Sequence, residues 1–320
     1  MPRQRRPINQ DLFTKGGIIT ERDPDYCIVR LRMPAGMITP AQMKEVGEIA
    51  ARYGVEKVHL TTRQTMEFPH VDPSKLEPLL ADLEKNGTPL GAERQEVVNI
   101  TSCLGTRNCK CGIIDSVALA EEIDRKFFGK DLPVKVRIAI SSCPNGCESE
   151  RLNEIGITGI QRPIRDPGLC TGCGTCTHYC REKAIEVVDG IIVLHPNKCM
   201  ECGFCILPCP FHIIQGTPPE YRITVGGHRG RHPKIGRHLI DVKTPEEVLK
   251  VVDKVIYWIY RQASMDAMLP EQLDDLDFDE FKKTIVQMIE GWSRSVLTLP
   301  GSSFIKRQGN IFHLTRSIAA

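Results

Sequence analysis

Apolar and polar residues alternate over residues 26–33, YCIVRLRM, which predicts a β-strand with one apolar face. Arg30 and Arg32 lie on the opposite face of this strand. Helical spacing of apolar residues then occurs twice, and short alternating segments separate the two helices. This βαββα order is typical of one ferredoxin-like α+β half-domain. The predicted elements are strand 26–33, helix 40–53, strands 55–61 and 64–68, and helix 73–85.

Similar patterns continue further along the chain. Lys135 and Arg137 share the polar face of a predicted strand at 133–140. Residues 244–247, TPEE, form a capping box with proline at the first helical position, which predicts the start of a long amphipathic helix. The predicted elements are helix 115–128, strands 133–140, 155–160 and 221–227, and helices 245–263 and 277–290.

Composition indicates an ordinary folded chain of two or three domains. The 320 residues are 41% hydrophobic and 26% charged, and the net charge of +2 excludes a global nucleic-acid-binding charge. No apolar run approaches the roughly 18 residues that span a bilayer. The basic N-terminus, MPRQRRPINQ, precedes no apolar segment, so we expect no secretory signal, no membrane partner and a cytoplasmic protein. The fourteen cysteines are then thiols or metal ligands, because disulfides are rare in that compartment.

Turn-forming residues around 163–168 and 216–219 separate a cysteine-rich insert from the chain on either side. The insert repeats one cysteine spacing, C-x2-C-x2-C-x3-C, and the second copy ends in Cys209-Pro210. In two-cluster bacterial ferredoxins the fourth cysteine of each run ligates the other cluster. We therefore expect two [4Fe–4S] clusters rather than zinc, although Arg181 replaces the proline of the first copy. Their ligands are Cys170, Cys173, Cys176 and Cys209 for one cluster, and Cys199, Cys202, Cys205 and Cys180 for the other.

A different spacing, C-x5-C and C-x3-C, places further cysteines on two separate loops: Cys103 with Cys109, and Cys143 with Cys147. These pairs fit one more [4Fe–4S] cluster, a zinc site or buried thiols, and spacing alone does not choose among them. Cys27 is predicted to be a core thiol and Cys111 to be inert.

Several segments resemble the family of siroheme-containing sulfite and nitrite reductases. They are TSCLGTRNC (101–109), SSCPNGCESERLNEIG (141–156), HLTTRQTMEF (59–68), VRLRMPAGMIT (29–39) and YRITVGGHRGRHPKIGR (221–237). The resemblance covers residues 26–260, and the ferredoxin insert makes the chain most similar to small anaerobic members of the family. It implies an α+β fold in four parts: a ferredoxin-like half-domain (1–96), a siroheme and [4Fe–4S] domain (97–165), the inserted ferredoxin domain (166–217), and the rest of the siroheme domain with C-terminal helices (218–320).

The resemblance also implies cofactors and site residues. Cys147 is expected to bridge the [4Fe–4S] cluster held by the two loops to siroheme. Arg32, Arg63, Lys135 and Arg137 are expected to act on the substrate. An arginine is expected before the first cysteine motif, where Val98 stands and Arg94 is the nearest candidate. The siroheme carboxylates and ring are expected to contact Arg30, Arg107, Gly226, Gly227, His228, Arg229, Arg231, Lys234 and Arg237.

By resemblance, the chain reduces sulfite to sulfide. Reduction of nitrite to ammonia and a non-catalytic electron-transfer subunit remain alternatives. The sequence contains no GxGxxG fingerprint, so we expect an external electron donor, either a ferredoxin or flavin and iron–sulfur subunits. Because the chain carries one copy of a unit that larger enzymes carry twice, we also expect a homo-oligomer or a hetero-complex.

Overall fold

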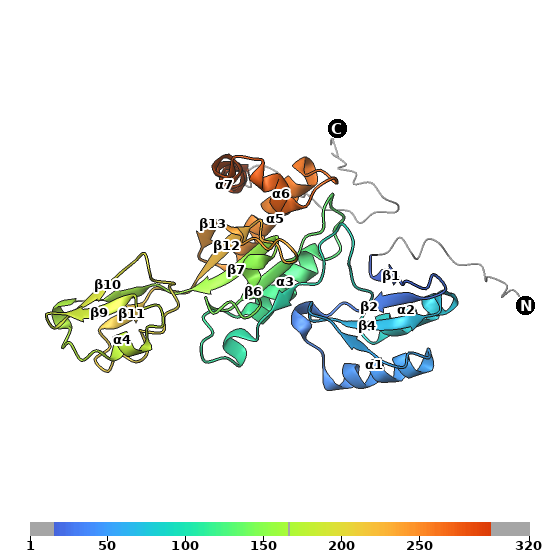
Figure 1. Ribbon diagram of the computed structural model, residues 1–320, viewed down its shortest axis with the longest axis horizontal. Helices are drawn as coiled ribbons and strands as arrows, with labels where there is room; N and C mark the ends of the chain where they lie inside the picture. The colour runs from blue at the N-terminus through green and yellow to red at the C-terminus, as the bar shows by residue number, and fades with distance from the viewer. Residues whose placement is uncertain (1–15, 166, 296–320) are drawn as a thin grey trace, which may run out of the picture.

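The computed structural model describes residues 16–165 and 167–295. Figure 1 shows three bodies in a row, with the cysteine-rich insert at one end and the ferredoxin-like body at the other. The expectation about a secretory signal concerns residues outside this description, as does the boundary residue Asp166. No helix in the described part of the chain is long and apolar enough to cross a membrane.

The first body is an antiparallel sheet in the order β1-β2-β4-β3, with two helices packed against it (Figure 1). The predicted βαββα unit is present, but β2 ends at Arg30 because Leu31 forms only an isolated bridge to Leu90. Its core includes Phe68 and Leu76, both fully buried. The elements are β1 (Ile18–Thr20), β2 (Cys27–Arg30), α1 (Pro40–Arg52), β3 (His59–Leu60), β4 (Met66–Val71) and α2 (Leu76–Lys85).

The central body is a five-stranded mixed sheet in the order β13-β12-β7-β6-β5. The pairs β5–β6 and β6–β7 are parallel, whereas β12 pairs antiparallel with β7 and β13. Helix α5 begins where its capping box predicts, whereas β5, β13 and α6 were not predicted, and the strand expected at 133–140 begins only at Ile138. The elements are β5 (Thr101–Ser102), α3 (Ser116–Phe127), β6 (Ile138–Ser141), β7 (Ile155–Ile160), β12 (Glu220–Val225), β13 (Arg237–Val242), α5 (Pro245–Gln262), α6 (Leu269–Asp274) and α7 (Phe278–Ser295).

The insert leaves the central sheet after β7 and returns before β12. Its entry and exit segments pair with each other as β8 and β11, and its hairpin turns at Asp189-Gly190, both with positive φ. Its small core consists of cysteines and isoleucines. The elements are β8 (Pro163–Arg165), α4 (Thr175–Tyr179), β9 (Ile185–Val188), β10 (Ile191–Leu194) and β11 (Ile214–Gly216). Short 3-10 turns lie at Pro34–Gly36, Pro73–Lys75, Gly105–Arg107, Glu150–Leu152 and Pro167–Leu169.

Candidate active site

The two cysteine loops of the central body meet because they follow neighbouring parallel strands. Cys103 comes directly after β5, and Cys143 comes two residues after β6. The Cys103 amide donates to the carbonyl of Ile140 (3.2 Å), and the Ser142 amide donates to the Cys103 Sγ (3.1 Å). Parallel strands end at one edge of a sheet, so the fold itself brings the two pairs together.

The thiols of these loops act on one another electrostatically. Burial, together with the negative charges of Cys103, Cys147 and Cys111, raises the pKa of Cys143 to about 11. Burial also raises the pKa of Cys147, with contributions from Cys103 and Cys109. Several of these cysteines can therefore be thiolates at the same time only if positive charge lies between them. Metal ions of a cluster would supply that charge. Cys111, predicted to be inert, lies close enough to belong to this group.

The cysteines of the insert line two separate cavities. One cavity is lined by Cys170, Cys173, Cys176 and Cys209. The other is lined by Cys180, Cys199, Cys202 and Cys205. These are the two groups that the crossed ligation pattern predicts, and their ligand roles stay a prediction. Across the described residues, no three His, Cys, Asp or Glu side chains converge on the position of a single metal ion.

Electrostatics within the second cavity agree with this grouping. Burial, together with the charges of Cys202, Cys199 and Cys180, raises the pKa of Cys205 to about 12. Arg181, which replaces the expected proline, places its guanidinium 5.6 Å from the ring of Phe204. The replacement therefore contributes a cation–π contact across the cavity rim.

A cluster of cations lies between the ferredoxin-like body and the central sheet; we refer to Arg30, Arg63, Lys135, Arg137 and Arg229 as the cationic cluster. Burial, together with the charges of Arg137, Arg229 and Arg30, lowers the pKa of Arg63 to about 10, while Glu154 opposes the shift. Burial likewise lowers the pKa of Lys135, with Arg137 and Arg30 as the next causes. The shifts show that these positive groups are close and poorly solvated, as an anion site requires.

Arg63 is held by two contacts that leave part of its guanidinium without a partner. Its Nη1 donates to the Asn153 Oδ1 (3.0 Å) and its Nη2 donates to the carbonyl oxygen of Asn99 (2.7 Å). The Asn99 side-chain amide also donates to the Arg63 carbonyl oxygen (2.9 Å). The Nε atoms of Arg63 and Arg229 are buried and have no hydrogen-bond partner among the residues described. Such orphaned donors are costly unless an anion satisfies them.

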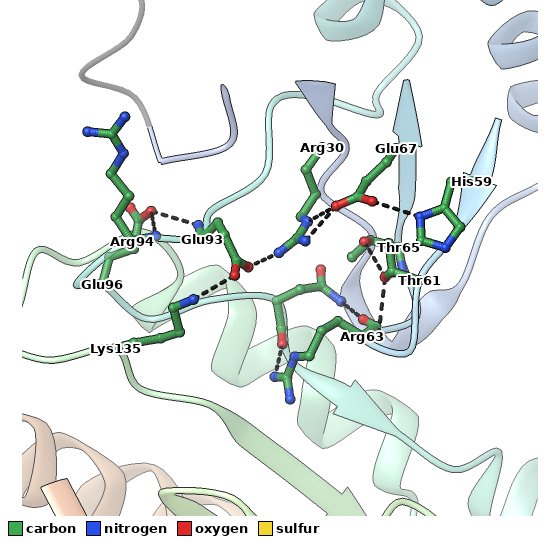
Figure 2. A network of polar contacts seen from close by, with 11 residues as sticks. Arg30, His59, Thr61, Arg63, Thr65, Glu67, Glu93, Arg94, Glu96 and Lys135 are labelled. Atoms are coloured by element: carbon green, nitrogen blue, oxygen red, sulfur yellow. Dashed lines mark hydrogen bonds and ion pairs between the residues drawn. The ribbon is translucent and has the colours of Figure 1, made fainter. Parts of the chain in front are cut away.

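Carboxylates hold the other members of the cluster in place. Lys135 donates to the Glu93 Oε1 (2.5 Å), and Glu93 also pairs with Arg30, as Figure 2 shows. Arg137 forms a two-pronged pair with Glu154, whose Oε2 accepts from the Arg137 Nε (2.8 Å) and backbone amide (2.9 Å). Hydrogen bonding to Glu154 raises the pKa of Arg137. These contacts fix where the positive charges sit.

Arg30 and Arg32 both differ in their contacts from what was expected. Arg30 pairs with Glu67 (2.5 Å) and belongs to the cationic cluster, whereas it was expected to contact the siroheme carboxylates. Arg32, expected at the substrate, instead pairs with the buried Asp124 of α3 (Nε to Oδ2, 2.9 Å) and stacks 4.2 Å over the ring of Phe128. Although β2 ends at Arg30, the predicted alternation of faces continues, since Leu31 and Met33 are buried and Arg32 is only partly buried.

The basic residues of segment 228–237 contact two different parts of the protein. The Arg229 Nη2 donates to the carbonyl oxygen of Glu148 (2.5 Å), next to Cys147. Lys234 pairs with Asp274 of α6, and the Arg237 Nη2 donates to the Leu273 carbonyl oxygen (2.5 Å). Arg229 therefore reaches the cysteine loop, while the other two tie β13 and its preceding loop to α6.

Four further predicted contact residues lie in this segment: His228, Arg231, Gly226 and Gly227. His228 and Lys234 exchange backbone hydrogen bonds across a turn, and Arg231 is exposed. A Cβ on Gly227 would lie 2.3 Å from the Arg151 carbonyl oxygen, and one on Gly226 would lie 3.1 Å from Leu273. The two glycines therefore allow the turn to pack closely against the protein, and their expected contact with a cofactor stays a prediction.

Arg107 is exposed and pairs with Asp115 (3.3 Å) and Glu121 (3.8 Å), outside the cationic cluster. Val98 is buried, and Figure 2 shows the Arg94 side chain pointing away from Arg63. The identity of the expected arginine, with Arg94 as the nearest candidate, stays a prediction.

Sequence reasoning missed the polar residues that support the cluster: Asn99, Asn153, Glu93, Glu154 and Gln64. The Gln64 Nε2 donates to the Glu148 Oε1 (2.9 Å) and to the Ser102 carbonyl oxygen (2.9 Å), linking the two bodies. Gln64 and Glu154 stand inside the motifs that carry the family resemblance, and that was the available signal. Gln64, Glu148 and Cys103 also line an open cavity whose other walls include Met33 and Met66.

The fold and these sites define an α+β protein that joins a ferredoxin-like half-domain to a cysteine-bearing mixed sheet, with a desolvated cationic cluster between them. The chain belongs to the nitrite and sulphite reductase 4Fe-4S domain family, whose model matches residues 93–291. The nitrite/sulfite reductase ferredoxin-like half domain matches residues 19–86. These matches confirm the predicted family and the predicted ferredoxin-like half.

Relatives of known sequence agree with this assignment. An uncharacterized protein of Methanocaldococcus jannaschii is 35% identical over 76% of this chain and 84% of its own. The coenzyme F420-dependent sulfite reductase of the same organism is 29% identical over 86% of this chain, which spans only 44% of that relative. One subunit of the anaerobic sulfite reductase of Salmonella typhimurium is 26% identical over 72% of this chain and 73% of its own.

A solved structure supports the fold. Dissimilatory sulfite reductase I aligns with a TM-score of 0.67 over 91% of this chain and 74% of that chain, at 16% identity. At this identity the likeness shows the shared fold alone.

Proposed function

We propose that the chain reduces sulfite to sulfide at siroheme, with electrons delivered through the cysteine sites of the insert. The observation that carries this proposal is the cationic cluster beside Cys147, with buried guanidinium atoms of Arg63 and Arg229 that lack partners in the described chain. Two relatives named as sulfite reductases support the choice of substrate. Because the proposed clusters need these cysteines as thiolates and not as disulfides, we place the protein in a reducing compartment, the cytoplasm.

The residues present fit the implied cofactors. Cys103, Cys109, Cys143 and Cys147 interact electrostatically and would hold a [4Fe–4S] cluster. The unpartnered donors of Arg63 and Arg229 fit carboxylates or an oxyanion, and the cavity beside Gln64 and Cys103 offers space for a macrocycle between the two bodies. When bound, siroheme and its linked cluster supply electrons and an iron centre that binds an anion.

Side chains of the protein bind the sulfite anion and supply protons. Arg63 and Arg137 are held by Asn153 and Glu154, so they present fixed positive charge to a sulfite dianion. Lys135 is suited to donate protons from its Nζ as the sulfite oxygens leave as water, because its lowered pKa makes it a stronger acid than an ordinary lysine. Arg32 contributes if it leaves Asp124 and turns to the substrate.

The insert is the proposed entry for electrons, through one cluster in each of its two cavities. The donor is a separate low-potential carrier, either a ferredoxin or a flavin and iron–sulfur partner. A second copy of the chain or another subunit completes the unit that larger enzymes carry twice.

An anaerobic preparation tests the function. We expect an absorption spectrum with a Soret band, iron and sulfide for three clusters, and oxidation of reduced viologen by sulfite. A much higher kcat/KM for nitrite would change the substrate to nitrite. A protein with clusters but no Soret band would be an electron-transfer subunit, and the proposal would fail.

A further inference from the structure

The two cysteine cavities of the insert differ in what lies beside them. The cavity of Cys180, Cys199, Cys202 and Cys205 is also lined by Pro144 and Asn145, which stand between Cys143 and Cys147. The cavity of the other four cysteines is lined by residues of the insert alone, 170–214. One cysteine group therefore adjoins the loop of the proposed active site, and the other faces away from it.

A network of charged side chains joins the nearer cysteine group to the central sheet. Glu201 stands between Cys199 and Cys202. Its Oε1 accepts from the Arg162 Nε (2.9 Å), and its Oε2 accepts from the Arg222 Nη2 (2.6 Å). The two arginines converge on Asp241 of β13, at 2.7 Å and 3.0 Å from its Oδ2. Arg162 also pairs with Glu220 at the start of β12.

Backbone contacts add to these ion pairs. The Gln161 amide donates to the Glu201 carbonyl oxygen (2.7 Å), and Gln161 forms a parallel bridge with Cys202. Glu201 has a φ of 57°, a conformation that costs a non-glycine residue energy and that the surrounding contacts must maintain. The Arg222 and Asp241 side chains are 29% and 18% exposed, so the network is shielded from water and stronger than isolated surface pairs.

We propose that Arg162, Arg222 and Asp241 clamp Glu201 and so hold the cluster of Cys180, Cys199, Cys202 and Cys205 at a fixed distance from the Cys143–Cys147 loop. The four cysteines of this group would hold the relay cluster, and the other four cysteines of the insert would hold the entry cluster. When bound, the two clusters would carry single electrons from the external carrier to the cluster of the Cys143–Cys147 loop. The inference rests on the proposed function, and the clamp residues act by positioning, since none of them contacts substrate.

The need for a clamp follows from the shape of the molecule. In Figure 1 the insert projects from the ends of β7 and β12 as a separate body. Electron tunnelling weakens exponentially with distance, so small swings of this body would change the transfer rate strongly. A network of several charges on two strands and one loop restricts such swings better than the two connecting segments would alone.

Arg222→Met in the holoprotein tests the clamp, with Arg125→Met on the exposed face of α3 as the matched control. After reduction with dithionite, we expect the electron paramagnetic resonance spectra of wild type and the control to show magnetic coupling between the relay cluster and the cluster of the Cys143–Cys147 loop, in addition to the coupling between the two insert clusters. Arg222→Met should weaken the coupling to the loop cluster and exchange the Gln161 amide hydrogen faster, while the coupling within the insert, the iron, the sulfide and the Soret absorbance stay unchanged. Arg222→Lys should restore part of both. If Arg222→Met does not fold, Asp241→Asn provides the same measurement.

The outcomes separate the clamp from the proposed function. Retained coupling to the loop cluster and retained protection of Gln161 in Arg222→Met, with a full Soret band, would refute the clamp alone. A wild-type protein without a Soret band, but with protection of Gln161 that depends on Arg222, would refute the proposed function and support the clamp. Loss of the coupling to the loop cluster in Cys173→Ser, which alters the outer group, would reverse the order of the two clusters.

Discussion

Replacing Glu154 by glutamine is the sharpest test of how the cationic cluster is held. The Glu154 carboxylate is almost fully buried, and three donors of Arg137 converge on it. Glutamine keeps the shape of the side chain but removes its charge and turns one acceptor into a donor. At least one of the Arg137 donors then faces an N–H group instead of an oxygen.

The size of the effect follows from burial. Removing one partner of a buried ion pair costs about 3–5 kcal/mol. Arg137 keeps 20% of its side chain exposed, so water compensates part of the loss, and we expect the lower end, about 3 kcal/mol. In a domain of about 200 residues each 1 kcal/mol lowers Tm by about 2–4 °C, which gives a decrease of roughly 6–12 °C.

Thermal unfolding followed by circular dichroism measures this change. Glu121→Gln is the control, because Glu121 is 48% exposed and lies 3.8 Å from Arg107; its effect should stay within about 0.5 kcal/mol. A Tm for Glu154→Gln that falls no more than that of the control would show that Glu154 does not anchor Arg137, and the account of the cluster would be wrong.

Three other predictions follow from the site. Lys135 must be protonated to donate, and its pKa lies below the ordinary 10.5, so kcat/KM for sulfite should fall with rising pH from a lower pH than for a free lysine. Lys135→Arg should abolish that fall. An unchanged pH profile in this variant would exclude Lys135 as the proton donor. Gly227→Ala should lower Tm by several degrees, because its Cβ would overlap the Arg151 carbonyl; an unchanged Tm would contradict the close packing. Cys111→Ser should retain all the iron of wild type, whereas Cys109→Ser should lose iron, and equal losses would make Cys111 a ligand.

Local features of the fold were predictable from the sequence. The cap of α5 at Thr244 was predictable because a cap depends on residues within one helical turn. The grouping of the insert cysteines into two sets followed from a short repeat, and the structure lines two cavities with the same sets. Short strands such as β5 and β13 were missed, since two to six residues carry little periodic signal and their pairing partners lie far away in the sequence.

Residue type and local order were enough to identify the family, the cysteine spacings and the candidate cations. They were not enough to say which cations meet, and that depended on the packing of the folded chain. Arg30 pairs with Glu67 and Glu93, while Arg32, two residues later, pairs with Asp124. Lys234 and Arg237 contact α6. A buried charge needs a counter-charge as a partner, and those carboxylates come from distant parts of the chain that only folding brings together.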